Sequence, residues 1–176
     1  LSPRSRRDAG LFHTAFLLPS RADLGRWLSF AIANEIPLQG ASDHIVSEAV
    51  YLADPEGNGI EIYADRAPSH WRDAKGDIHM ATEAMDAQGV LNSAAGTQWS
   101  GFPEDGFIGH VHLQVGDTEA ATHFYRNTLG FDLASDYPGA AFFGSGGYHH
   151  HLAGNIWNSR GAPQRPQNMA GLNGVD

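Results

Sequence analysis

The sequence has no cysteine, few basic residues and no long apolar segment. Without cysteine the chain can form neither a disulfide scaffold nor a thiolate metal site, which favours a cytoplasmic location. Eleven lysines and arginines against 20 aspartates and glutamates give a formal net charge of −9, which argues against nucleic acid or an anionic membrane as the main partner. No apolar run approaches the roughly 20 residues that a membrane-spanning helix needs.

The chain contains enough apolar residues for a folded core and an unusual number of histidines. Its 176 residues are 41% hydrophobic and 18% charged, which is typical of one globular domain or two small modules. Several of the ten histidines lie in apolar segments that we expect to be strands. Histidine chemistry is therefore the first function to consider.

Two segments of the chain show the same order of expected elements: one strand, one helix and three strands. In each, an apolar strand precedes a helix with a capping residue, Ser20 in the first segment and Asp117 in the second. The strands expected in the first segment are 10–18, 44–47, 49–53 and 60–64. Those expected in the second are 108–115, 131–135, 140–143 and 147–152. The sequence therefore predicts an α+β protein with two tandem βαβββ modules.

A carboxylate, Glu61, lies in the middle of an apolar strand within DPEGNGIEIYAD (54–65). Burying a charge is costly unless something pairs with it, and a metal ion is one such partner; a carboxylate that faces water or pairs with an arginine is the alternative. His13 lies in the first apolar strand, and His110 and His112 share one face of a later strand. Two histidines and one carboxylate match a facial triad, although hydrogen-bonded core histidines would give the same pattern.

Several segments resemble the vicinal-oxygen-chelate superfamily, which includes glyoxalase I, bleomycin-resistance proteins and type I extradiol dioxygenases. GHVHLQVGDTEAATHFYRNTLGF (109–131) resembles the opening of one module of that superfamily. The pairing of GLFHTAFLLPSRADL (10–24) with VYLADPEGNGIEIYAD (50–65) resembles another. The chain is most similar to bacterial four-module proteins called catechol-2,3-dioxygenases. The resemblance implies open, curved, antiparallel or mixed sheets with a helix on the outer face, and module exchange between subunits would favour a homodimer.

The family has four modules, and this chain shows two that resemble the second and the third. The resemblance divides the chain into a module (1–66), a connector (67–107), a second module (108–158), and a tail or start of a fourth module (159–176). In the intact family the ligand partner of His13 and Glu61 would come from the first module. The resemblance therefore implies either that His110 takes that role here or that the triad is incomplete within this chain.

The resemblance assigns metal ligands residue by residue. His13 matches the histidine ligand on the first strand of a module, and Glu61 matches the carboxylate ligand on the fourth strand. His110 matches the first-strand histidine of another module and is preferred to His112 because it lies seven residues before Asp117, the usual spacing of the family.

Three further residues are candidates for the same site. Tyr51 matches the active-site tyrosine of extradiol enzymes, and His44 falls near their acid/base histidine. His151 aligns with Glu61 when Gly147 is set against Gly57. It would then be a fourth ligand, as in glyoxalase-type sites, or a substrate contact, unless the histidines 149–151 simply belong to a polar strand.

These residues imply a metal-dependent extradiol dioxygenase that cleaves the ring of a catechol-type substrate with O2. Fe(II) is the expected metal, with Mn(II), Zn(II) and Ni(II) as alternatives. His44 would act as general base and then as general acid, because imidazoles titrate near neutral pH, and Tyr51 would hydrogen-bond the substrate. Two alternatives stay open: a glyoxalase-like metal isomerase or lyase in which His151 is a ligand, and a metal-free binding protein of the bleomycin-resistance type.

Overall fold

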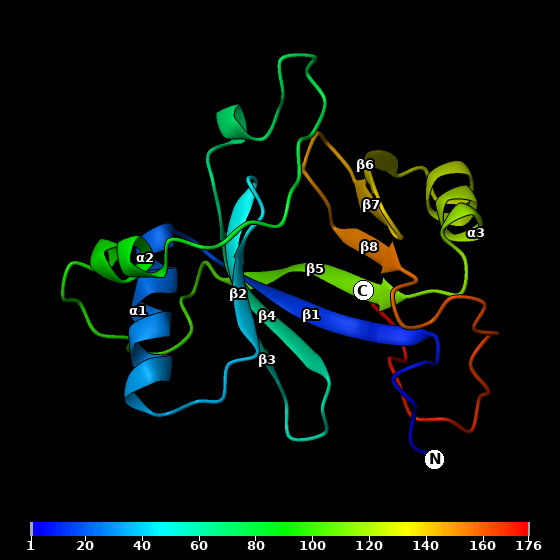
Figure 1. Cartoon of the computed structure of the whole chain (residues 1–176), viewed down its shortest axis with the longest axis horizontal. Coiled ribbons are helices and arrows are strands. Elements are labelled where there is room, and N and C mark those ends of the chain that lie inside the picture. The colour runs from blue at the N-terminus through cyan, green and yellow to red at the C-terminus, as the bar shows by residue number, and fades with distance from the viewer. Residues whose placement is uncertain (1, 176) are drawn as a thin grey trace. The chain divides into compact units, whose positions relative to one another are not determined.

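The computed structural model describes residues 2–175. The segment Ala15–Gly109 forms one compact unit, called the central unit below. The described residues up to Thr14 and from His110 onward form the other, called the terminal unit. The chain passes between the units inside two strands, β1 (Gly10–Leu18) and β5 (Phe107–Gln114), which carry blue and green in Figure 1.

In the central unit, two helices cover one face of a sheet. The helices are α1 (Arg21–Ala33) and α2 (Ala87–Ser93), which lie side by side in Figure 1. The strands of this sheet lie in the order β2-β3-β4-β1. They are β2 (Gly40–Asp43), β3 (Ser47–Ala53), β4 (Gly59–Asp65) and the end of β1. A 3₁₀ turn, η1 (Pro68–His70), follows β4. The Ser20 hydroxyl accepts a hydrogen bond from the backbone N–H of Asp23, so the predicted cap starts α1.

The two faces of this sheet have different roles. Ile62 and Ala64 face α1 and pack with Leu24, Trp27 and other buried residues into one apolar core. Burial of each large side chain in such a core stabilises the fold by about 1.5–3 kcal/mol. Because side chains alternate along a strand, Glu61 takes the opposite face of β4. The predicted alternation of β4 is confirmed.

In the terminal unit, the strand order is β1-β5-β8-β7-β6. β8 (Leu152–Asn155) pairs parallel with β5 and antiparallel with β7 (Ala140–Gly144), and β7 pairs antiparallel with β6 (Asp132–Tyr137). The Asp117 carboxylate caps α3 (Thr118–Thr122), which continues as a π-helical segment, η2 (His123–Thr128). Gly130, with φ of 84°, follows the end of this segment.

The order of elements confirms the predicted α+β class with βαβββ occurring twice. Two of the expected strands are wrong. The second strand is 40–43 rather than 44–47, because Ile45 has a φ of 69° that no strand allows. The last strand begins at Leu152 rather than at 147, because positive φ angles at Gly146 and Gly147 turn the chain.

The compact units are not the predicted modules, so the boundaries 1–66, 67–107, 108–158 and 159–176 stay predictions. The predicted connector (67–107) contains the short helix α2. None of the helices among residues 2–175 has the length and apolar character to span a membrane.

Candidate functional site

Two histidines meet in the terminal unit. His13 on β1 and His110 on β5 are 6% and 4% exposed, and their Nε2 atoms are 3.3 Å apart. Two nitrogens that each lie about 2.1 Å from one ion are about 3.0–3.4 Å apart when they bind at adjacent positions. Imidazole nitrogens suit Fe, Zn, Ni and Cu ions. Both the distance and the chemistry of this pair therefore fit a metal ion.

His112 lies on the same face of β5 but is already engaged. Its Nε2 atom is 3.0 Å from Nδ2 of Asn155. The backbone N–H of Trp157 donates to Oδ1 of Asn155 at 3.2 Å, which orients the amide so that Nδ2 faces the imidazole. An amide nitrogen only donates, so Nε2 of His112 accepts this bond and carries no proton.

In the central unit, Glu61 lies directly across the β3–β4 pair from Tyr51. The Glu61 side chain is 3% exposed. Burial raises the pKa of Tyr51 well above its ordinary value, and the charge of Glu61 and a hydrogen bond to it act in the same direction. Tyr51 is therefore a phenol, not a phenolate, throughout the physiological pH range.

His44 extends this polar chain. Its Nδ1 atom is 2.8 Å from the carbonyl oxygen of Ala81, and its Nε2 atom is 2.6 Å from the hydroxyl oxygen of Tyr51. A carbonyl oxygen only accepts, so Nδ1 carries a proton. When the His44 ring is neutral, its Nε2 atom accepts a hydrogen bond from the Tyr51 hydroxyl. When the ring is cationic, Nε2 donates to the Tyr51 hydroxyl oxygen, and the Tyr51 hydroxyl donates to Glu61. The structure thus brings His44, Tyr51 and Glu61 into one chain that can hold or move a proton.

The three consecutive histidines lie in a loop and not in a strand. The side chain of His151 is exposed, and its ring packs against Tyr148 at an interplanar angle of 39°, with centroids 4.7 Å apart. Burial of part of the ring, and then the neighbouring His149, lower the pKa of His151. No sequence pattern pointed to His150, whose ring centroid lies 4.2 Å from that of His110.

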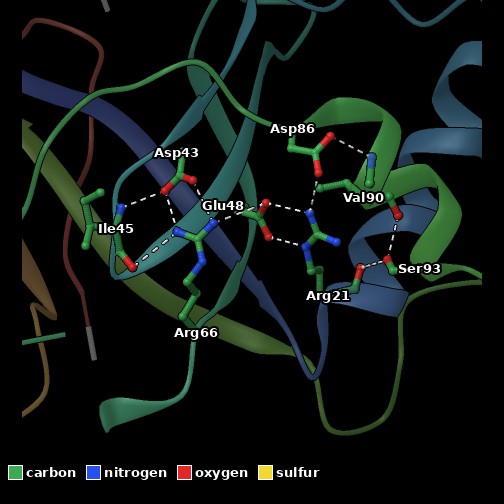
Figure 2. Close-up of polar contacts among 9 residues, drawn as sticks. Arg21, Asp43, Ile45, Glu48, Arg66, Asp86, Val90 and Ser93 are labelled. Atoms are coloured by element: carbon green, nitrogen blue, oxygen red, sulfur yellow. Dashed lines mark hydrogen bonds and ion pairs between the residues drawn. The ribbon is translucent and has the colours of Figure 1, made fainter. Parts of the chain in front are cut away.

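A cluster of ion pairs in the central unit was also not anticipated. Glu48, 2% exposed, lies between Arg21 and Arg66, and Arg66 also holds Asp43 (Figure 2). The sequence does contain a signal for this cluster. Glu48 is a carboxylate inside the apolar strand SEAVYLA, and Glu61 is a candidate for a paired, buried charge for the same reason.

Comparison with known proteins identifies a matching family and a relative of high sequence identity. Residues 107–172 match the family described as the Glyoxalase/Bleomycin resistance protein/Dioxygenase superfamily. A protein of Bacillus subtilis (strain 168) named catechol-2,3-dioxygenase is 48% identical over 170 residues. The match covers 95% of this chain and 59% of the relative, so the chain spans less than two thirds of the relative's length.

Solved structures match the chain at low sequence identity. A putative dioxygenase from Bacillus subtilis subsp. subtilis str. 168 matches with a TM-score of 0.52 and 12% identity, over 84% of this chain and 40% of that one. A methylmalonyl-CoA epimerase from Mycobacterium tuberculosis matches with a TM-score of 0.46 and 12% identity, over 92% of this chain and 94% of that one. The first of these likenesses concerns the fold alone.

Proposed function

We propose that the chain contributes to a metal-dependent extradiol dioxygenase acting on catechol-type diols and O2, because residues 107–172 match the glyoxalase/bleomycin resistance/dioxygenase superfamily. The name of the 48% identical relative supports the reaction class. The observation that carries the proposal is the pair of buried imidazoles whose Nε2 atoms lie 3.3 Å apart.

The proposed metal ligands are His13, His110 and Glu61. All three are buried, and together they offer two imidazole nitrogens and one carboxylate oxygen. This is the donor set of non-haem Fe(II) oxygenases, so Fe(II) is the proposed metal, with Mn(II), Zn(II) and Ni(II) as alternatives. When bound, such an ion supplies Lewis acidity toward the diol oxygens and redox chemistry toward dioxygen.

The proton work is proposed for His44 and Tyr51. With Nδ1–H bonded to the carbonyl of Ala81, the neutral His44 ring presents Nε2 as its basic atom. Nε2 would take a proton from a substrate hydroxyl and later return it, as a general base and then a general acid. The Tyr51 hydroxyl, 2.6 Å from Nε2, would hydrogen-bond the deprotonated substrate oxygen.

The test is metal binding, followed by oxygen uptake. The chain is loaded anaerobically with Fe(II) and dialysed, and its metal is measured by elemental analysis before catechol and O2 are added. Glu61→Gln, His13→Gln and His110→Gln should each weaken metal binding more than about 100-fold, since even partners outside the ligand set are worth 10–100-fold. His112→Gln is the matched control and should keep the metal.

The outcomes separate the proposal from its alternatives. Retained metal in Glu61→Gln would remove Glu61 from the ligand set. A redox-silent metal without oxygen uptake would favour the glyoxalase-like isomerase or lyase, with His151 as the added ligand to test. No retained metal in the unmodified chain would favour a binding protein of the bleomycin-resistance type. The homodimer stays a prediction, for which light scattering after size-exclusion chromatography is the measurement.

A further inference from the structure

The residue after His44 has an unfavourable backbone conformation. Ile45 has a φ of 69°, a region that branched side chains rarely adopt. Such strain persists only where the surroundings over-determine it, and it often accompanies a functional residue. Contacts from neighbouring residues must therefore hold the turn at Ile45 in this conformation.

The side chains of Arg66 and Asp43 make these contacts (Figure 2). Arg66 donates two parallel hydrogen bonds to the Asp43 carboxylate, from Nη1 to Oδ1 and from Nη2 to Oδ2, the latter at 2.7 Å. Oδ1 of Asp43 accepts the backbone N–H of Ile45 at 2.8 Å, and Nη1 of Arg66 also donates to the Ile45 carbonyl at 3.3 Å. One guanidinium therefore binds the residues on both sides of His44.

Arg66 itself is held by a buried charge. Its Nη2 lies 3.4 Å from Oε1 of Glu48, whose side chain is 2% exposed. Glu48 also accepts hydrogen bonds from Arg21, at 2.5 Å from Nε and 2.9 Å from Nη2. The hydrogen bond to Asp43 raises the pKa of Arg66, so the guanidinium stays charged at every relevant pH.

The His44 backbone has little remaining freedom. Its N–H donates to the carbonyl of Ser47 at 2.8 Å, and the N–H and carbonyl of the preceding Asp43 bond to Glu83 at 3.0 Å and 2.9 Å. The Arg66–Asp43 pair thus fixes the backbone from which the ring reaches both Ala81 and Tyr51.

We propose that Arg66, acting through Asp43, is a positioning residue that holds the left-handed turn at Ile45 and so aims the imidazole of His44 at the Tyr51 hydroxyl. The positioning concerns the fold alone, whereas its catalytic value rests on the proposed function. Lysine cannot replace Arg66, because an ammonium is a point charge and cannot form the two-pronged contact.

The experiment measures the His44 ring directly, by ¹⁵N NMR of the imidazole in the metal-free chain. Wild type should show the Nδ1-protonated form of the neutral ring. Arg66→Lys and Asp43→Asn should each convert this signal to a mixture of tautomers. Arg21→Lys is the matched control, because it loses the same kind of contact to Glu48 but touches neither Asp43 nor Ile45. It should leave the His44 signal unchanged.

A second variant tests the strain argument. Glycine adopts positive φ without penalty, so Ile45→Gly added to Arg66→Lys should restore the wild-type His44 signal. A double variant whose His44 signal stays mixed would refute the claim that Arg66 acts through this turn. An unchanged signal in both Arg66→Lys and Asp43→Asn would overturn the positioning role altogether.

Kinetics then connect the position to the reaction. If the loaded chain takes up oxygen, kcat of Arg66→Lys should fall about 10- to 100-fold, a part of the 10²–10⁴-fold that a positioned acid or base contributes. KM should stay within about twofold, because Arg66 is not among the residues proposed to bind the substrate. Altered His44 signals together with no oxygen uptake by wild type would refute the proposed function and leave the positioning role standing.

Discussion

The buried carboxylate of Glu48 gives a prediction whose size follows from its contacts. The side chain is 2% exposed and is bound by Arg21 at 2.5 Å and 2.9 Å, with Arg66 at 3.4 Å. The Glu48→Ala variant loses the carboxylate. The positive charges of Arg21 and Arg66 then lie near each other without a negative charge between them. The free energy of unfolding of the central unit should therefore fall.

The magnitude can be bounded from both sides. Removing one partner of a fully buried ion pair costs about 3–5 kcal/mol. Here the two arginine side chains are 39% and 30% exposed, so water can solvate them again once the carboxylate is gone. We expect a loss of about 2–3 kcal/mol, well above the 0–1 kcal/mol of a surface pair.

The assay is urea unfolding followed by tryptophan fluorescence, since three of the four tryptophans, at positions 27, 71 and 99, lie in the central unit. Glu48→Gln keeps the shape and one acceptor and should lose less than the alanine variant. Glu56→Ala removes an exposed carboxylate and should change the unfolding free energy by less than about 0.5 kcal/mol. A Glu48→Ala loss as small as that of Glu56→Ala would refute the reasoning from burial.

Two further predictions concern pH and packing. The hydrogen bond from Arg66 lowers the pKa of Asp43, so this carboxylate stabilises the fold fully above its unfolded pKa of about 3.9 and loses that effect as the pH falls through its folded value. Asp43→Asn should flatten the decline of the unfolding free energy below about pH 4. A Cβ at Gly109 would lie 2.0 Å from the Tyr63 hydroxyl, so Gly109→Ala should cost about 1–3 kcal/mol in urea unfolding. Gly40→Ala, with no atom within 4 Å of its Cβ, is the control.

Local signals account for the parts of the fold that the sequence predicts correctly. The caps at Ser20 and Asp117 act within three residues, and the alternation of β4 depends on neighbours in the same strand. These interactions leave their pattern in consecutive letters, which is why both βαβββ orders could be predicted.

The two wrong strands have causes that the local pattern does not contain. Ile45 and Val46 look like strand residues, but the turn at Ile45 is held by Arg66, 21 residues further along. The three consecutive histidines 149–151 show no alternation of apolar and polar residues. The positive φ angles of Gly146 and Gly147 turn the chain before them. In both places the conformation depends on backbone strain or distant contacts and not on apolar periodicity.

The choice between His110 and His112 shows the same limit within the site. Both histidines lie on the same face of β5, so the alternation of the strand does not distinguish them. Only the spacing to Asp117 favours His110. The relevant difference comes from Asn155, 43 residues from His112, whose amide occupies the lone pair on Nε2. Nε2 of His112 must lose the bond from this amide before it can bind a metal. Nε2 of His110 is instead hydrogen-bonded to Nε2 of His13 at 3.3 Å, and one metal ion could bind both of these nitrogens in place of that bond. This asymmetry is the physical reason to expect metal loss in His110→Gln and metal retention in His112→Gln.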